Sequence, residues 1–420
     1  MSILLSRSFY VHPLKPPVPG REKDDKPENL PIIANKQISF GGKEHEKDFL
    51  SLVFTIGFCL VLGSCRSGNR KKQNVVATQT YRSNIRYAQG FWLEQHENYR
   101  LLHIKDPQSE TSSEYTFALR QRGTHPELPP HIPVLDLPIR GVICMTSLQL
   151  SNFIKLGATS QVVGISSTRF LNNATIRQQL AEGKTQKIGI EGNFDAEIIM
   201  NLAPDLILIS PFKQGGYDAM KEVDIPLVPH LGYKETTPLG QAEWIKFVGL
   251  LIGEEEKANK IFNEIEQKYN DLKRLTARVE HRPVVLSGEI HGGTWYAVGG
   301  QSFLAQVFKD AGANYFLKDD PRSGGVYLDF ETVYNQADQA DYWRILNSYP
   351  GQYTYETLLA QDERYGDFKA FKQKGVIYCN MRENPITKIC PWNRNYYLLT
   401  SLKYFIRNYY RIMYRYTIIS

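Results

Sequence analysis

The chain has 420 residues, of which 42% are hydrophobic and 22% charged, and a formal net charge of +6. This length predicts about two or three domains with sizeable cores. The six Lys and Arg residues of 386–420, a segment without Asp or Glu, account for the whole net charge. The rest of the sequence therefore lacks the basic stripe of a nucleic-acid-binding protein. The five Cys residues have no paired metal-type spacing, which argues against a disulfide framework or a zinc site.

The N-terminal region reads as a leader, a signal segment and a tether. Residues 1–48 are polar and rich in Pro and Lys, which predicts a disordered leader or translated sequence upstream of the true start. Segment 49–65 holds an apolar run shorter than the about 20 residues of a membrane-spanning helix, and it fits a signal peptide. Its ending, Leu62-Gly63-Ser64-Cys65, resembles a bacterial lipobox and implies lipidation of Cys65. The alternative is a buried strand that ends in Cys. Residues 66–86 form a polar tether.

Residues 87–236 predict a first α/β lobe. Residues 99–104 and 115–120 are expected to form a hairpin. From residue 142 short apolar runs alternate with helical patterns, and Ser147 is expected to cap a helix over 148–156. The other predicted elements are strands 142–145, 161–165, 205–209 and 226–228 and a helix over 195–201. Such alternation favours a mainly parallel sheet with helices on both faces.

Residues 237–280 predict a helical backbone between two lobes. After a helix over 237–252, the stretch from 254 to about 276 has apolar residues at three- and four-residue spacing, which makes one apolar stripe. At 1.5 Å per residue this helix is roughly 33 Å long. Residues 281–385 repeat the alternation, with strands 283–287, 294–298, 342–346 and 375–380 and helices 302–311, 329–335 and 365–372.

The predicted fold class is therefore α/β, with two Rossmann-like lobes joined by one long rigid helix and a cleft between them. A stiff connection predicts a small tilt of the lobes and a largely preformed cleft. Residues 386–420 form an atypical tail. It is either a basic amphipathic surface helix or, as we prefer, an aberrant segment such as a frameshift produces.

Two motifs carry a resemblance to a known family. Residues 195–207, DAEIIMNLAPDLI, and residues 328–333, LDFETV, each place a Glu at the start of a short helix. Over roughly residues 135–385 the sequence resembles the substrate-binding proteins of ABC importers for cobalamin, ferric siderophores and haem. The resemblance implies a monomeric, periplasmic, lipid-anchored protein that delivers an iron-siderophore or cobalamin chelate to an ABC permease and its ATPase. It also implies that Glu197 and Glu331 dock onto permease arginines. The alternative role for each Glu is stabilisation of the helix dipole.

Candidate ligand-binding residues follow from the rule that ligands of open α/β sheets bind beyond the carboxyl ends of the strands. Aromatic rings and arginines at those ends suit a large, flat, partly anionic ligand. Trp295 and Arg322 are the strongest candidates because both lie in Gly-flanked loops, the second within residues 322–327. The predicted set is Ser147, Arg169, Tyr217, His230, Tyr233, Trp295, Tyr296, Arg322 and Arg382.

The sequence gives weaker support to other functions. The sequence has no G-x-S-x-G elbow, P-loop or H-E-x-x-H motif, and one Glu and one His in the loop Gly288–Gly293 are weak support for catalysis, so we predict no enzyme. No cofactor or resident metal is predicted. Three alternatives keep the same fold: a haem-binding protein with His230 or a Tyr as axial ligand, a metal-ion-binding protein that uses His230 and His291, and a surface binding lipoprotein without a transport role.

Overall fold

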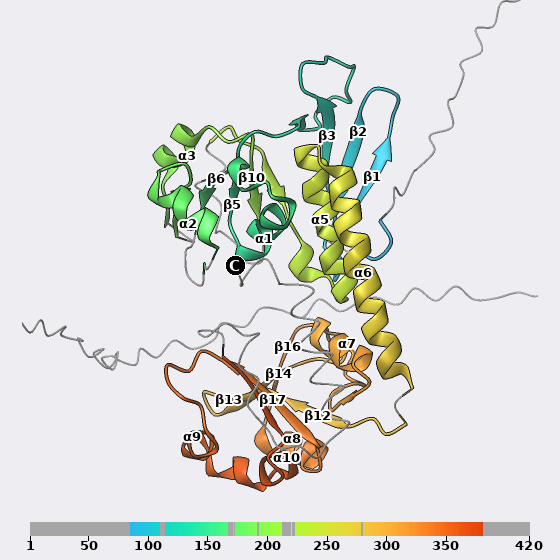
Figure 1. Cartoon of the computed structure of the whole chain (residues 1–420), viewed down its shortest axis with the longest axis vertical. Helices are drawn as coiled ribbons and strands as arrows, with labels where there is room; N and C mark the ends of the chain where they lie inside the picture. The colour runs from blue at the N-terminus through green and yellow to red at the C-terminus, as the bar shows by residue number, and fades with distance from the viewer. Residues whose placement is uncertain are drawn as a thin grey trace, which may run out of the picture. The chain divides into compact units, whose positions relative to one another are not determined.

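The computed structural model describes residues 85–380, apart from 110–113, 167–170, 172, 191–192, 212–219, 221–222 and 279 (Figure 1). The chain divides into two compact units, Met1–Gln73 and Asn74–Ser420, and all described residues belong to the second. The predicted leader, the signal segment with Cys65, most of the tether and the tail lie outside the described residues. Among the residues that are described, no helix combines the length and the apolar character needed to cross a bilayer.

The first sheet in the chain, the N-terminal sheet, lies within residues 87–236 that were predicted as the first lobe. Its strands lie in the order β1-β2-β3-β4, with β1–β2 and β2–β3 antiparallel and β3–β4 parallel. The predicted hairpin is confirmed, since Arg100 of β2 pairs with Leu119 of β3. Strands β1 and β4 were not predicted, the second because it lies in a Pro-rich segment. The bounds are β1 Phe91–Gln95, β2 Arg100–Ile104, β3 Tyr115–Gln121 and β4 Val134–Leu137.

The first lobe is built on a parallel sheet in the order β11-β10-β5-β6-β7. Alternate residues of β5 enter two separate cores. Val142 packs in the core that includes Phe153 of α1, whereas Ile143 packs in the core that includes Ile199 of α3. The predicted cover of both sheet faces by helices is therefore confirmed. The bounds are β5 Val142–Cys144, β6 Val162–Ile165, β7 Gln186–Lys187, β10 Leu206–Ile209, β11 Leu227–Pro229, α1 Ser147–Leu156, α2 Ala174–Ala181 and α3 Ala196–Leu202, with the short pair β8 Gly189–Ile190 and β9 Asn193–Phe194 and the 3₁₀ turns Thr159–Gln161 and Gly232–Lys234.

The start of α1 corrects one prediction. The N-cap is Thr146, whose hydroxyl accepts from the Gln149 backbone N–H while the Gln149 side chain accepts from the Thr146 N–H. Ser147 is instead the first residue of the helix. The two-way exchange is a capping box, which a Thr followed three residues later by Gln favours over Ser followed by Leu150.

Helices α5 (Pro238–Ile252) and α6 (Glu255–Ala277) follow the first lobe. Nearly every residue of α5 is buried, whereas α6 is amphipathic, as its periodicity predicts. The N-terminal half of α6 packs on α5, where a Cβ added at Gly249 would lie 2.4 Å from the Cβ of Ala258. The C-terminal half bonds to α7 of the second lobe, because the Tyr269 hydroxyl donates to the Asp310 carboxylate at 2.7 Å and the Thr276 hydroxyl donates to its backbone oxygen at 2.6 Å. The first half of α6 is therefore fixed to α5 and the second half to the second lobe.

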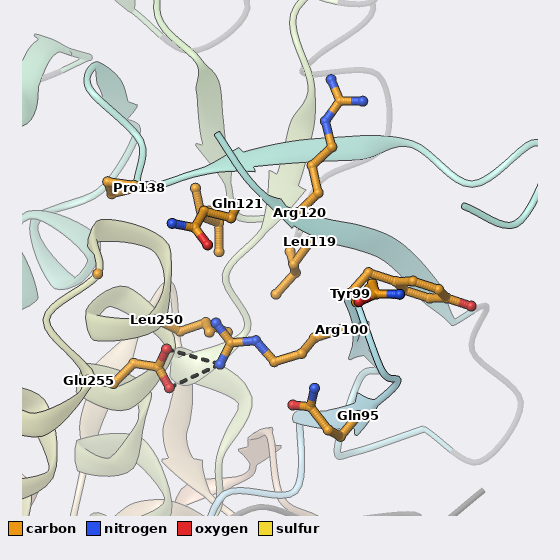
Figure 2. A pocket seen from close by; sticks show the side chains of 12 residues that line it. Gln95, Tyr99, Arg100, Leu119, Arg120, Gln121, Pro138, Leu250 and Glu255 are labelled. Atoms are coloured by element: carbon orange, nitrogen blue, oxygen red, sulfur yellow. Dashed lines mark hydrogen bonds and ion pairs between the residues drawn. The ribbon is translucent and has the colours of Figure 1, made fainter. Parts of the chain in front are cut away.

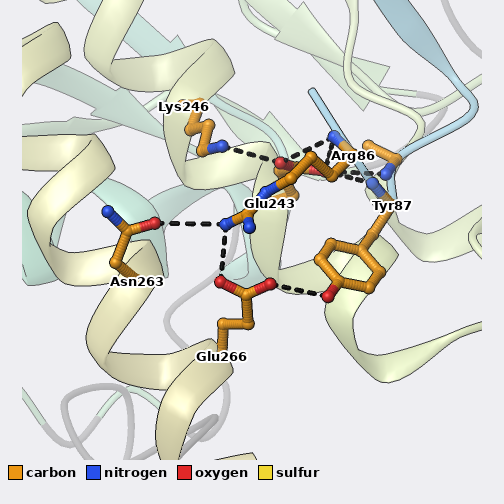
Figure 3. Close-up of polar contacts among 7 residues, drawn as sticks. Arg86, Tyr87, Glu243, Lys246, Asn263 and Glu266 are labelled. Carbon is orange, nitrogen blue, oxygen red and sulfur yellow. Dashed lines mark hydrogen bonds and ion pairs between the residues drawn. The ribbon is translucent and has the colours of Figure 1, made fainter. Parts of the chain in front are cut away.

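Residues 86–90 are held against α5 and α6 by carboxylates, among them the buried Glu243 and the half-buried Glu266 (Figure 3). Glu243 of α5 accepts from the backbone N–H groups of Arg86, Tyr87 and Ala88 at 2.6–3.0 Å, and also from the Lys246 ammonium at 2.7 Å. The Tyr87 hydroxyl and the Arg86 guanidinium donate to Glu266 of α6 at 2.6 and 2.5 Å. We call residues 86–90 the docked segment.

The second lobe combines a parallel sheet, in the order β15-β12-β17-β18, with a small antiparallel sheet, in the order β13-β14-β16. Strand β14, predicted as part of the regular alternation, lies in the small sheet. The helix predicted over 365–372 is interrupted at Phe368, whose φ of −65° and ψ of 136° are extended. The bounds are β12 Val284–Ser287, β13 Glu289–His291, β14 Thr294–Val298, β15 Asn314–Tyr315, β16 Gly325–Leu328, β17 Tyr342–Asn347, β18 Val376–Asn380, α7 Phe303–Asp310, α8 Phe330–Ala337, α9 Tyr355–Gln361, α10 Lys369–Lys372 and the 3₁₀ helix Glu363–Asp367. The predicted α/β class, with two lobes joined by a long helix, is confirmed.

Candidate functional site

Helices α3 and α8 begin in the same way in the two lobes. Asp195 caps α3 by accepting from the Ile198 N–H at 3.0 Å, and Asp329 caps α8 by accepting from the Thr332 N–H at 2.7 Å. Two residues beyond each cap stands an exposed glutamate, Glu197 or Glu331. Both glutamates thus occupy the second helical position, where the helix dipole favours a negative charge.

The cap of the second helix start has an additional side-chain hydrogen bond. The hydroxyl and the N–H of Thr332 both donate to Asp329, and these hydrogen bonds hold the pKa of its carboxyl below the ordinary value. The start of α8 therefore exposes two carboxylates, Asp329 and Glu331, as the start of α3 exposes Asp195 and Glu197.

A buried polar network joins the carboxyl ends of the first-lobe strands to α1. Gln149 donates to the Ser210 hydroxyl beyond β10 at 3.0 Å, and its side-chain oxygen accepts from the Met145 N–H beyond β5 at 2.7 Å. The Asn152 amide donates to the imidazole of His230, beyond β11, at 3.4 Å. Ser147 is exposed at this edge, and Tyr233 is half-buried.

His230 lies in the core of the first lobe. Its side chain is 1% exposed, and its ring centroid lies 4.6 Å from that of Trp244 and 5.7 Å from that of Phe247. Burial lowers the pKa of His230 to about 3, so the ring is neutral at physiological pH. His230 therefore offers almost no surface to a ligand, and axial ligation of haem would require it to leave the core.

Trp295 is also a core residue. Its side chain is fully buried, its indole N–H donates to the Ser287 backbone oxygen at 3.1 Å, and its ring lies 5.6 Å from that of Trp343. The reason is the alternation of β14, in which Trp295 and Ala297 point inward and Tyr296 outward. The period-two pattern in TWYAV carries this signal, although the flanking glycines favoured a loop. Trp295 is therefore also left out of the proposed ligand site.

The outward face of the small sheet is aromatic. Tyr296 of β14 pairs in register with Tyr327 of β16, and their ring centroids are 5.3 Å apart. The two side chains are 37% and 69% exposed, and the His291 ring lies 6.4 Å from Tyr296. The sequence placed Tyr327 in a candidate loop without singling it out. We call Tyr296, Tyr327 and His291 the aromatic face.

Beside the aromatic face, hydrogen bonds connect the carboxyl ends of β12, β17 and β18. The Asn347 amide donates to Glu289 at 3.0 Å, and the Tyr378 hydroxyl donates to the Asn347 side-chain oxygen at 2.8 Å. Tyr353 stacks on Tyr378 with ring centroids 4.1 Å apart, and the His291 imidazole lies 3.6 Å from the second Glu289 oxygen. Asn347 is the last residue of β17 and directly follows the predicted strand 342–346, so the rule of strand ends applied there would have found it.

The remaining predicted residues are placed as follows. Arg322 is exposed and donates to both carboxylate oxygens of Asp320, and these contacts lower the pKa of that carboxyl. Arg169, Tyr217 and Arg382 lie outside the described residues. In the part of the chain that the structure describes, no group of three or more His, Cys, Asp or Glu side chains is arranged to hold a metal ion.

Glu289 makes the stability of this region dependent on pH. Burial raises the pKa of its carboxyl, so the folded protein holds this proton more tightly than the unfolded chain does. The stability gained from this tighter proton binding is fully present below the unfolded pKa of about 4.5. It is lost as the pH rises through the higher pKa of the folded state. Glu289→Gln keeps a neutral acceptor for Asn347. The free energy of unfolding of this variant, relative to that of the wild type, should therefore increase with pH, by at most about 1.4 kcal/mol per pH unit.

Urea unfolding at about pH 5 and about pH 7.5 measures this difference. Glu264→Gln makes the same substitution at an exposed position on α6 and should follow the wild type at both pH values. Parallel pH profiles for wild type and Glu289→Gln would contradict the role given to this carboxyl.

Comparison with known proteins decides the family. The profile of the periplasmic binding protein family matches residues 142–382, which is more than half of the chain. The chain belongs to the periplasmic binding protein family. The match spans the first parallel sheet, the two long helices and the second lobe, and it begins after the N-terminal sheet.

Individual relatives of this periplasmic binding protein are distant. An uncharacterized lipoprotein of Methanocaldococcus jannaschii is 26% identical over 261 residues, which covers 59% of this chain and 60% of the relative. A second uncharacterized lipoprotein of that organism is 27% identical over 219 residues, covering 50% and 56%. The chain thus spans less than two thirds of the length of these curated relatives. Among solved structures, the periplasmic haem-binding protein HutB of Vibrio cholerae is 16% identical with a TM-score of 0.49, and the match covers 64% of this chain and 96% of that one.

Proposed function

We propose that this chain is the substrate-binding component of an ABC importer. It captures an iron-siderophore or cobalamin-type chelate and delivers it to an inner-membrane permease and its ATPase. The observation that carries the proposal is the matched pair of helix starts, Asp195-x-Glu197 and Asp329-x-Glu331. A permease that engages both lobes at once needs one exposed acidic anchor on each. Charged anchors of this kind set the register and steer the encounter.

The proposed ligand site combines the carboxyl edges of the two lobes. The aromatic face offers two tyrosine rings with large exposed area, which suits a flat chelate. The first lobe contributes Ser147 and Tyr233, and the exposed Arg322 is suited to the anionic oxygens of a chelate. Arg169, Tyr217 and Arg382 belong to the same proposal on the strength of their sequence positions.

The proposal also covers the organisation of the chain. It is a monomer anchored through lipidated Cys65 and held in the periplasm, with a tether over 66–86. The first lobe covers 87–236, the helical backbone 237–280 and the second lobe 281–385. The lipoprotein names of the two relatives support the anchor.

A binding assay tests the ligand class. The protein from Asn74 onward is incubated with a ferric hydroxamate siderophore, cobalamin or haem, while tryptophan fluorescence and the visible spectrum are followed. We expect saturable binding of a chelate. Tyr296→Ala combined with Tyr327→Ala should weaken it by about 10- to 100-fold, because two aromatic contact surfaces are lost.

Tyr115→Ala provides the matched control, since this tyrosine is 39% exposed on the N-terminal sheet. Its binding should equal that of the wild type. A response to haem alone would move the ligand class to haem. Binding of bare Zn²⁺ alone, or undiminished chelate binding by the double variant, would contradict the proposed site.

A further inference from the structure

A pocket of about 340 Å³ lies between the N-terminal sheet and the corner where α5 meets α6 (Figure 2). Most of its lining precedes residue 142, where the family match begins. It is therefore distinct from the ligand site proposed above. The lining residues are Gln95, Asn98, Tyr99, Arg100, Leu119, Arg120, Gln121, Leu137, Pro138, Leu250, Gly253 and Glu255.

The charges around this pocket are already paired. Arg100 donates to both carboxylate oxygens of Glu255 at 2.9 and 3.0 Å, as Figure 2 shows. Arg120 donates to both oxygens of Asp136 at 2.5 and 3.2 Å. An anionic ligand would have to compete with Glu255 for Arg100 and would lie close to the like charge of that carboxylate, which disfavours it. The pocket therefore does not favour an ion.

The rest of the lining combines an apolar wall with neutral hydrogen-bonding groups. The accessible apolar surface comes from Pro138, which is exposed, and from the ring of Tyr99, which is half-buried. Leu119, Leu137 and Leu250 also line the pocket but are at most 7% exposed. The side-chain amides of Asn98 and Gln121 are exposed and make no hydrogen bond within the described part of the chain. Each amide offers both donors and an acceptor. With the arginine N–H groups and the glutamate oxygens, the pocket thus presents donors and acceptors side by side above an apolar surface.

We propose that this pocket binds a neutral polyhydroxylated molecule of about monosaccharide size. Hydroxyl groups both donate and accept, so each finds a complement in Asn98, Gln121 or the Arg100–Glu255 pair without displacing a charge. The C–H face of a sugar ring can pack on the accessible apolar surface of Pro138 or Tyr99. The pocket volume is at the lower end of the roughly 300–1,000 Å³ range of small-molecule sites, which suits one sugar ring better than a chelate.

Ligand-detected NMR and calorimetry with the purified full-length chain test this site. The probes are glucose and myo-inositol as neutral polyols, with inorganic phosphate as the charged comparison. Gln121→Trp fills the opening and should abolish saturable polyol binding. Asn98→Ala removes one amide and should weaken it by about two- to tenfold. Gln339→Trp, at an exposed position of the second lobe, is the matched control and should bind like the wild type.

Melting temperatures equal to that of the wild type establish that the variants are folded. If the Gln121→Trp variant does not fold, Asn98→Ala still tests the site. No polyol binding by the wild type, equal binding by all variants, or a preference for phosphate would each overturn the proposal. Because the assay contains no metal chelate, its failure leaves the importer function untouched.

Discussion

Glu243→Leu is expected to lower the free energy of unfolding by about 3–5 kcal/mol. The carboxylate is completely buried on α5 and satisfies three consecutive backbone N–H groups of the docked segment together with the Lys246 ammonium. Leucine fills much of the same volume but accepts no hydrogen bond. The variant therefore leaves three partly buried N–H donors and a buried cation without this acceptor, which costs far more than one average hydrogen bond.

Urea denaturation followed by tryptophan fluorescence measures this loss. Glu264→Leu, the same substitution at an exposed position of α6, should change stability by no more than about 0.5 kcal/mol. Limited proteolysis should also cut the Glu243→Leu variant near residue 86 earlier than the wild type. Equal unfolding midpoints for the Glu243→Leu variant and the wild type would show that the docked segment does not depend on this carboxylate.

Glu197→Ala combined with Glu331→Ala is expected to reduce ligand uptake by tenfold or more while ligand affinity stays unchanged. Removing one partner of a close charge pair at an interface costs about 2–5 kcal/mol, so losing both anchors should weaken docking severely. Each glutamate is exposed and contributes only about 0.3–1 kcal/mol to its helix through the dipole. Folding should therefore be largely preserved.

Glu356 offers a matched control for this experiment. It is exposed at the second position of α9, the same helical position as Glu197 and Glu331, but it follows a Thr cap instead of an Asp cap. Uptake by Glu356→Ala should equal that of the wild type. If the double variant transports normally, or if it also loses ligand affinity, the docking role is wrong.

Local signals made much of the fold predictable. The limits of α5 and α6 follow from the Thr237 cap, the glycine at 253 and the periodicity of the apolar stripe, and the structure agrees within about one or two residues. The Asp caps of α3 and α8 are visible in the same local way. The break in the helix at Phe368 was harder to predict, because it depends on packing of this residue against Trp295 and Trp343 from distant strands.

The ligand-site predictions show where local signals stop. Residues at strand ends can be found from the sequence, but whether such a side chain faces solvent depends on what packs over it. His230 is covered by Trp244 and Phe247 from α5, and nothing next to residue 230 in the sequence records this. The bonds among Glu289, Asn347 and Tyr378 depend on the lateral order β12-β17-β18, which places three distant segments side by side.

The length of α6 limits where the sequence can accept insertions. Its first half is fixed to α5 by Ala258, and its second half is fixed to α7 by Tyr269 and Thr276. One residue inserted between these contacts would turn one set by about 100° around the helix axis relative to the other and shift it by about 1.5 Å. The orientation of Glu197 relative to Glu331 therefore depends on the number of residues in α6 between these contacts. Insertions are tolerable in the surface loops of either lobe, but the middle of α6 admits none.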